Sequence, residues 1–354
     1  MLTPPRRLRR RPGALYSSGQ WHPAEPALPQ RSRRPNLERA PCRRFASAVL
    51  GRARKAIRHA RAYPSKALKE FRATLAGLHT LRTLQQWRHP LELRQRRSSA
   101  RQVSPAPLAV PRDHGYRALS PDEFPGGADL VRRCREIYET RVGGASTSER
   151  LKDHYLADLL DDDLLRGHPE FVDFALQDTI LNAATTYLGT LPVLRRVGLL
   201  LSTPREARGD SMLLHRDPED FEQIKLFLNI YDVDDRHGPF TFLPAAASAD
   251  ALRGIQARET GMRRFRRYQD SEVFEFCEPS STVAAAGPAG SGVLVDTCRC
   301  LHYGSRVRAG HFRLVYYVQF CRYHLPVRTS ANRFDRQRFQ DDAIRWRVLT
   351  PDRR

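Results

Sequence analysis

The feature that most constrains the fold is a series of short apolar runs between Val197 and Phe320. Glycine, proline or aspartate stands between one run and the next. Short apolar runs separated by turn residues are typical of antiparallel strands that form a sandwich or a jelly roll. The runs are VGLLLS, EQIKLFLNIYDV, PFTFLP, SEVFEF, STVAAA, SGVLVDT and FRLVYYVQF.

The residues before these runs, from Ser120 to Leu188, have a mostly helical pattern. SPDEF begins with a capping residue followed by acids, which favours a helix start. HPEFVDFALQDTILNAATTYLG has Pro169 near its first turn and Gly189 just past its end, as helices often do. The sequence therefore predicts an α+β fold in which supporting helices precede a β core.

The positive charge of the chain lies in its first third. Residues 1–112 contain 26 Lys and Arg against 4 Glu and no Asp, a net charge of +22, whereas residues 113–354 carry −1. Residues 1–44 are rich in Pro and Arg without an apolar period, so we predict that they are disordered. The near-neutral remainder gives no reason to expect nucleic-acid binding by the main domain.

Residues 45–95 are predicted to be a basic amphipathic helical segment, with apolar residues at three- and four-residue spacing. The Ser/Pro-rich stretch RRSSARQVSPAPLAVPRD that follows is typical of a linker, so we place the domain boundary near Arg112 and the main domain at 113–354. The helical segment either packs on that domain or contacts acidic surfaces such as nucleic acid or membrane headgroups. A mitochondrial presequence and a start codon chosen too far upstream are further alternatives for the N-terminus.

The cysteines indicate a reducing compartment. They are sparse and unevenly spaced, so they do not predict a disulfide framework, and a cytoplasmic location is the simplest expectation. No stretch approaches the roughly 18 uncharged apolar residues of a membrane helix. Cys-x-Cys-x-His lacks the usual zinc spacings, so buried, unligated cysteines are expected there. The cysteines are Cys42, Cys134, Cys277, Cys298, Cys300 and Cys321.

A histidine and an aspartate stand two residues apart where the β region begins, in LLHRDPED. Residues i and i+2 of a strand point to the same face, so His215 and Asp217 would project together and could hold a cation. Roughly one such spacing is expected by chance in a chain of this composition, so the pair alone is weak evidence and a surface pair remains an alternative.

The last strands add a third candidate ligand and a cation. His302 follows the apolar run SGVLVDT, and Arg313 lies in the next run, FRLVYYVQF. In that run Arg313 is predicted to share a face with Tyr317 and Gln319. Arginine is rarely buried without an anionic partner, and its guanidinium suits a carboxylate. The partner is either a ligand or a protein carboxylate such as Asp296.

Taken together, these motifs resemble the phytanoyl-CoA dioxygenase-like family of Fe(II)/2-oxoglutarate-dependent oxygenases. The shared features are His-x-Asp, a distal histidine, and an arginine eleven residues later. The segments that carry the resemblance are LLHRDPED, LFLNIYDVDDRHGPFTFLP, LVDTCRCLHYGSR and FRLVYYVQF. The resemblance covers roughly Val197 to Phe320 and does not touch residues 1–112. It implies a double-stranded β-helix, that is, a cupin-like jelly roll with supporting N-terminal helices.

The resemblance also implies a reaction and roles. His215, Asp217 and His302 would hold Fe(II), leaving open positions for 2-oxoglutarate and O2. Arg313 would pair with the distal carboxylate of 2-oxoglutarate. The products would be succinate, CO2 and a hydroxylated small-molecule substrate that the sequence does not identify. Related halogenases replace the carboxylate by a small residue; the presence of Asp217 therefore favours hydroxylation.

The sequence departs from the family at two places. The family's Pro-Gly-Ser-His after FLP is here Pro-Ala-Ala-Ala-Ser, and the usual hydroxyl two residues after the distal histidine is replaced by Gly304. Ser305, one position later, is the candidate for that hydroxyl, and Lys225 is an alternative carboxylate anchor to Arg313. His302 as an ordinary loop histidine, and a cupin-like metal-binding protein without oxygenase activity, also remain open.

Overall fold

The structure is a computed structural model that describes residues 89–103, 108–142, 156–205, 210–218, 220–258, 266–323 and 334–349, together with Thr80 and Leu84. The predictions of disorder in residues 1–44 and of a helix starting at residue 45 concern residues that lie outside these ranges, apart from the last part of the helical segment.

Six antiparallel strands form the main sheet, in the order β1-β7-β4-β9-β3-β2. All nine residues of β9 are buried between its neighbours β4 and β3. The antiparallel sheet predicted from the apolar runs is therefore confirmed. The strands are β1 (Tyr116–Leu119), β2 (Leu156–Asp158), β3 (Val193–Ser202), β4 (Ile224–Asn229), β7 (Gly292–Val295) and β9 (Arg313–Cys321).

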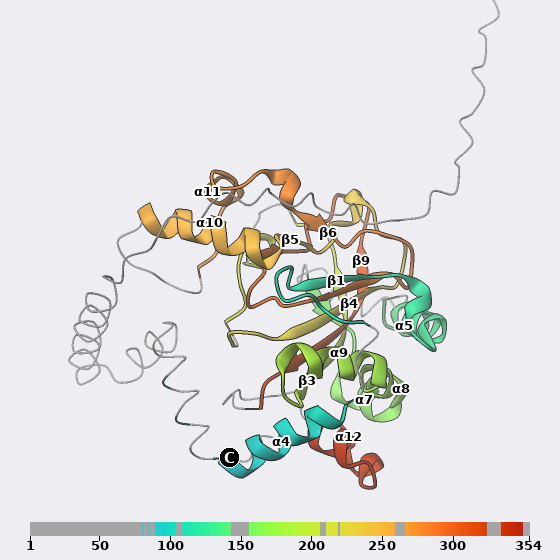
Figure 1. Cartoon of the computed structure of the whole chain (residues 1–354). Helices are drawn as coiled ribbons and strands as arrows, with labels where there is room; N and C mark the ends of the chain where they lie inside the picture. Colours follow the sequence, from blue (N-terminus) through green and yellow to red (C-terminus); the bar gives the residue numbers. More distant parts are fainter. Residues whose placement is uncertain are drawn as a thin grey trace, which may run out of the picture. The chain divides into compact units, whose positions relative to one another are not determined.

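Helices cover one face of the main sheet. The core on that face joins Leu314, Tyr316, Val318 and Phe320 of β9 to helix residues such as Phe171. Figure 1 shows α7, α8 and α9 gathered near β3. These helices are α5 (Gly127–Val142), α7 (Asp162–Gly167), α8 (Glu170–Ala175) and α9 (Asp178–Leu188). The opposite face of β9, which carries Arg313, Tyr317 and Gln319 as predicted, is left for the candidate site.

The predicted helix punctuation is confirmed in detail. Pro169 immediately precedes α8, and Gly189 ends α9 with a positive φ of 64° while its N–H donates to the carbonyl of Thr185. A glycine adopts that left-handed conformation without the clash of a Cβ. The pattern expected as one helix is two, α8 and α9, separated at Leu176 and Gln177.

A second, three-stranded antiparallel sheet has the order β6-β5-β8, with β5 (Thr241–Phe242), β6 (Val283–Ala284) and β8 (His302–Tyr303). Isolated bridges add Leu214 opposite Tyr268 and His215 opposite His302. Helices α10 (Ala245–Arg258) and α11 (Asp270–Phe274) pack in one apolar cluster with Leu214 and Leu301, and Figure 1 shows them beside β5 and β6.

One prediction of secondary structure is wrong in this part of the chain. SEVFEF, expected as a strand, overlaps helix α11, which begins one residue before it. The Glu272 side chain accepts from the backbone N–H of Gln269 at 2.7 Å, so a capping interaction starts a helix there. The alanine-rich residues after Pro244 form α10, whose Ala, Leu and Arg content favours helix.

Strand β2 lies in the stretch from Ser120 to Leu188 that was expected to be helical, and β1 lies just before that stretch. Both are short, and each gains its order by pairing with a longer strand, β7 or β3, so no local pattern marks them.

Helix α4 (Pro90–Gln102) lies before the predicted boundary near Arg112. Its Arg96 is fully buried and donates to the carbonyls of Pro192 at 2.9 Å and Arg347 at 2.6 Å. The stretch expected as a linker from Arg96 is thus helical up to Gln102, because Pro90 starts a helix and the prolines that exclude helix come only later. Helix α12 (Ala343–Val348) completes this packing.

Short 3-10 turns connect several elements: Pro121–Glu123, Asp210–Met212, Asp235–His237, Pro279–Ser281 and Arg336–Phe339. The acidic stretch DVDDRHG contains one of them, and Gly238 ends it with a φ of 62°, a conformation that suits glycine. Among the residues the structure describes, no helix has the length and apolar content to cross a membrane, and the five described cysteines are free.

Candidate metal centre

His215, Asp217 and His302 are brought together by backbone pairing at the edge of the small sheet. The backbone N–H of His215 donates to the carbonyl of His302 at 3.0 Å, and the reverse bond is 2.9 Å long. The Asp217 N–H donates to the carbonyl of Thr297 at 2.9 Å. Two segments far apart in the sequence are thus held in register, and the imidazole centroids lie 4.3 Å apart.

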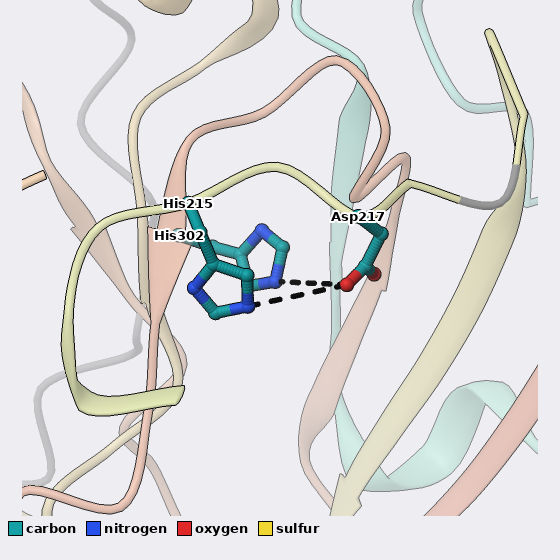
Figure 2. A group of neighbouring side chains, drawn as sticks. All are labelled: His215, Asp217 and His302. Atoms are coloured by element: carbon teal, nitrogen blue, oxygen red, sulfur yellow. Dashed lines mark ion pairs between the residues drawn. The ribbon is translucent and has the colours of Figure 1, made fainter. Parts of the chain in front are cut away.

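The three side chains point their ligand atoms at one another (Figure 2). Oδ1 of Asp217 lies 4.0 Å from Nε2 of His215 and 3.8 Å from Nε2 of His302. One ligand atom from each residue lies within 4.8 Å of the others. These separations are too long for hydrogen bonds and leave room for an ion between the three atoms.

Backbone carbonyls fix the tautomer of both imidazoles. Nδ1 of His215 lies 2.8 Å from the carbonyl oxygen of Leu213, and Nδ1 of His302 lies 3.0 Å from that of Cys300. A carbonyl oxygen only accepts, so each Nδ1 carries the proton. Each Nε2 then presents its lone pair toward Asp217, the arrangement that metal-binding histidines use.

The protonation states also suit a metal. Burial lowers the pKa of His215, and burial together with the neighbouring His215 lowers the pKa of His302 to about 3, so both rings are neutral at pH 7. Burial alone would raise the pKa of Asp217, but the charge and the hydrogen bond of the Lys225 ammonium hold it well below its usual value. Two neutral imidazoles and one carboxylate are therefore ready to bind a cation without first losing protons.

The donor set suits Fe(II), although catalytic Zn²⁺ also uses two histidines and a carboxylate. Two imidazole nitrogens and one carboxylate oxygen, without a thiolate, match the facial arrangement of non-haem Fe(II) oxygenases. The nearby Cys298 and Cys300 are buried and do not join the trio. Within the described part of the chain, no other group of three or more His, Cys, Asp or Glu side chains is close enough to hold an ion.

The second oxygen of Asp217 has partners of its own. Lys225 Nζ donates to Oδ2 at 2.5 Å, and Gln223 Nε2 donates to the same atom at 2.9 Å. Lys225, which the sequence left open as a carboxylate anchor, is thus ion-paired with a candidate metal ligand. Gln223 was not singled out from the sequence, because a glutamine one residue before a strand carries no distinctive signal.

Arg313, the first residue of β9, is 6% exposed and lies beside neutral acceptors. Its guanidinium donates to the carbonyl of Gly238 and lies 3.4 Å from Ser202 Oγ and 3.5 Å from Ser305 Oγ. Its Nε has no hydrogen-bond partner, and no carboxylate among the described residues pairs with it. Burial lowers the pKa of Arg313 to about 10, so it remains a cation at pH 7.

The alternative that Arg313 pairs with Asp296 is wrong. Asp296 is fully buried elsewhere, where the Tyr187 hydroxyl donates to it at 2.7 Å and the backbone N–H of Cys298 at 3.0 Å. A buried guanidinium without an anionic partner is costly, so the geometry around Arg313 fits a site for an external anion.

The backbone at Gly304 and Ser305 leaves space for the Arg313 guanidinium. A Cβ on Gly304 would lie 3.2 Å from Nη2 of Arg313, so glycine leaves space for the guanidinium. Ser305 is the one described non-glycine residue with a positive φ, 60°, and its hydroxyl lies 2.9 Å from Ser202 Oγ. Strained backbone of this kind is concentrated at functional sites. The structure thus brings Ser305, predicted from sequence, next to Arg313 and adds Ser202 and Gly238, which sequence reasoning missed.

Aromatic side chains connect the trio to the main sheet. Phe240 stacks on Phe227 with ring centroids 4.1 Å apart, and it lies 5.3 Å from the His302 ring. Phe227 in turn lies 5.4 Å from Tyr317. A groove of about 520 Å³ between α5 and the Ala289–Gly290 turn involves none of these residues.

No protein-family profile and no curated protein sequence matches this chain. Similar solved structures include the epimerase SnoN in complex with Fe3+, alpha ketoglutarate and nogalamycin RO, which is 16% identical with a TM-score of 0.38 and covers 66% of this chain and 85% of that chain. EctD from S. alaskensis, with 2-oxoglutarate and 5-hydroxyectoine, is 14% identical with a TM-score of 0.42, covering 60% of this chain and 73% of that one.

HygX from Streptomyces hygroscopicus, with nickel and 2-oxoglutarate bound, is 14% identical with a TM-score of 0.40 and covers 60% of this chain and 88% of that chain. At these identities and TM-scores the similarities carry no weight in assigning a function. The assignment rests on the side chains described above.

Proposed function

We propose that this protein is an Fe(II)- and 2-oxoglutarate-dependent dioxygenase that hydroxylates a small molecule. The observation that carries the proposal is the pairing of two features in one site. Three neutral or anionic ligand atoms converge within 4.8 Å, and a buried guanidinium nearby has no carboxylate partner. A metal-binding module alone has no use for the second feature.

In this proposal His215, Asp217 and His302 hold Fe(II), which activates O2 together with 2-oxoglutarate when both are bound. The overall reaction consumes one O2 and one 2-oxoglutarate and converts a substrate C–H bond to C–OH, with release of succinate and CO2. One oxygen atom enters the substrate and the other enters succinate. The backbone carbonyls at Nδ1 keep both imidazoles oriented throughout.

Arg313 receives the distal carboxylate of 2-oxoglutarate. Its free Nε and the hydroxyls of Ser202 and Ser305 supply neighbouring polar groups, and Gly304 leaves space. The guanidinium is already buried, so binding the carboxylate supplies the counter-charge that the protein lacks at this point. Phe227 and Phe240 give this region an apolar wall that excludes water.

We further infer membership of the phytanoyl-CoA dioxygenase-like branch. His-x-Asp, distal histidine and arginine follow in that order, and the arginine comes eleven residues after the histidine. The proposed core is a double-stranded β-helix within a catalytic domain at 113–354, with α4 packed on it as an accessory helix. The presence of Asp217 favours hydroxylation over halogenation, and a cytoplasmic location fits the free cysteines.

The test is anaerobic titration of the protein with Fe(II) and 2-oxoglutarate. A weak visible absorption that needs both additions is expected, followed by succinate release on admitting O2. His215→Ala should abolish both signals, whereas Arg313→Met should keep Fe(II) binding and lose the absorption at moderate 2-oxoglutarate concentrations. Fe(II) binding without any response to 2-oxoglutarate would instead indicate a metal-binding protein without oxygenase activity.

A further inference from the structure

The Asp217 carboxylate is shared between two sets of contacts. Oδ1 faces the two imidazoles, while Oδ2 accepts from Lys225 and Gln223. Gln223 is itself held, since its Nε2 also donates to Thr297 Oγ1 at 2.6 Å and its Oε1 accepts from Gln319 Nε2 at 2.8 Å. Gln223 is therefore held in place by two neighbouring side chains, and Lys225 projects from β4.

This arrangement decides how the carboxylate can meet a metal. A carboxylate that rotates freely can bind an ion through both oxygens and so occupy an extra coordination position. Two buried donors on Oδ2 oppose that rotation and leave one oxygen, Oδ1, for the ion. Conserving coordination positions matters in a site that must also admit two further ligands.

Lys225 differs from Gln223 in carrying a charge. It is 9% exposed and lies on β4. Its ammonium pairs with Oδ2 of Asp217, and the ion would lie beside Oδ1, the other oxygen of the same carboxylate. Coulomb repulsion between an ammonium and a metal ion rises with the charge of the ion, and burial reduces the screening by water. Such a cation opposes a trivalent ion more strongly than a divalent one.

We propose that Gln223 and Lys225 are positioning residues that hold Asp217 as a one-oxygen ligand, and that the Lys225 charge biases bound iron toward the ferrous state. This inference rests on the proposed function, because it requires iron at the trio. A purely structural ion pair would stabilise the fold in the same way but would leave the ratio of ferric to ferrous affinity unchanged.

The experiment uses the full chain as wild type, Lys225→Met, Lys225→Arg and Gln223→Met. Fe(II) affinity is measured anaerobically at pH 7, and the midpoint potential of the iron-loaded protein is measured by spectroelectrochemistry. Lys225→Met should raise the ferric-to-ferrous affinity ratio at least tenfold, which lowers the potential by about 59 mV for one electron. Lys225→Arg should stay near the wild-type potential because it retains the charge.

Gln223→Met separates positioning from charge. It should weaken Fe(II) binding about tenfold, as loss of a supporting hydrogen bond commonly does, and leave the potential unchanged. Thermal unfolding of each variant, followed by circular dichroism, verifies that the fold is retained; if Lys225→Met does not fold, Lys225→Gln replaces it.

An equal potential in wild type and the uncharged Lys225 variant would overturn the proposed bias, as would an equal shift in Gln223→Met, which would indicate general loosening. Unaltered Fe(II) affinity in Gln223→Met would overturn the positioning role. If wild-type protein binds no iron, the proposed function fails and this inference fails with it; if wild type binds iron and responds to 2-oxoglutarate, the variants test this inference alone.

Discussion

Asp217 and Arg313 are both buried charged side chains of the candidate site, but only Asp217 has an oppositely charged partner. Lys225 lies 2.5 Å from its carboxylate. Arg313 is surrounded by a carbonyl and two hydroxyls and has an Nε without any acceptor. The carboxylate among the candidate metal ligands is thus paired with a cation of the protein, whereas the Arg313 guanidinium has no carboxylate partner among the described residues.

This difference separates two kinds of functional residue. Removing one partner of a buried ion pair leaves an uncompensated charge and is strongly destabilising. Removing a buried charge that had no partner relieves a desolvation cost instead. Variants at the two ends should therefore differ in their effect on stability, a large loss for Asp217 and little change for Arg313, although both impair turnover in an oxygenase.

The largest effect is expected for Asp217→Ala. It leaves the Lys225 ammonium buried without a counter-charge and should lower the free energy of unfolding by about 3–5 kcal/mol. It should also weaken Fe(II) binding at least 100-fold. His215→Ala should weaken Fe(II) binding to the same extent. It should lower the free energy of unfolding by only about 1–2 kcal/mol, because it leaves no buried charge without a partner. Denaturant unfolding and anaerobic metal titration give both quantities.

A double variant tests the reason for that loss. Asp217→Ala combined with Lys225→Met should regain most of the lost stability, since neither charge remains. Additive losses in the double variant would show that the two side chains are not energetically coupled, and the contrast with Arg313 would then have no electrostatic basis.

The second effect concerns Arg313→Met. The affinity for 2-oxoglutarate should fall at least 100-fold, while the free energy of unfolding stays within about 1 kcal/mol of wild type, because the loss of a donor to Gly238 is offset by relief of desolvation. Isothermal titration with metal-loaded protein measures the first quantity and denaturant unfolding the second.

Arg96 provides the matched control for Arg313. It is also a buried arginine whose pKa burial lowers to about 10, but it is bound by Glu92 and by carbonyls. Arg96→Met should lower stability by about 2 kcal/mol or more and leave 2-oxoglutarate affinity unchanged. A large stability loss in Arg313→Met would contradict the view that Arg313 lacks internal compensation.

The sequence predicted the parts of this site that depend on local pattern. Alternation in FRLVYYVQF placed Arg313 on the face opposite Tyr316, and the His-x-Asp spacing identified two of the three candidate ligands. It could not show that Lys225 pairs with Asp217 and not with a bound carboxylate. That contact depends on the loop that carries Asp217 lying beside Lys225 of β4, and the sequence pattern does not show how a loop lies against a strand. Non-local pairing also explains why the short strands β1 and β2 were missed.

The α11 prediction failed for a different reason. SEVFEF alternates as a strand does, yet Gln269 and Glu272 form a local cap, and the buried Val273 packs with α10. Short apolar runs do not distinguish a strand from one turn of helix. The available signal was the capping pair formed by Gln269, just before the run, and Glu272 within it.

Asp296 is a third buried ionisable side chain, and its expected effect on stability is smaller than those of Asp217 and Arg313. Burial raises the pKa of Asp296 to about 7, since its partners are a hydroxyl and backbone N–H groups rather than a cation. The folded protein then holds a proton that the unfolded chain releases near pH 3.8. Between these values the folded state binds more protons, so stability falls as pH rises toward 7.

Asp296→Asn removes that titration. The unfolding free energy of the variant minus that of wild type should increase by about 2 kcal/mol as the pH is raised from 5 to 8, because only wild type loses stability over this range. Denaturant unfolding at the two pH values measures the change, and Asp232→Asn, at an exposed carboxylate, is the control. If the unfolding free energy of wild type instead rose with pH relative to Asp296→Asn, the Asp296 carboxylate would be ionised and compensated in the folded protein, as Asp217 is.

The smallest effect is expected at Ser305, where the backbone rather than the charge is adapted to Arg313. Its φ of 60° disfavours every residue with a Cβ. Ser305→Gly and Ser305→Ala both remove the hydroxyl near Arg313 and should weaken 2-oxoglutarate binding by a similar factor of roughly 3 to 10. Only the glycine variant relieves the backbone, so it should be more stable than the alanine variant by about 1 kcal/mol. Equal unfolding free energies for the two variants would show that no strain is held at this position, and unequal 2-oxoglutarate affinities would show that the backbone conformation, beyond the hydroxyl, helps to place the guanidinium.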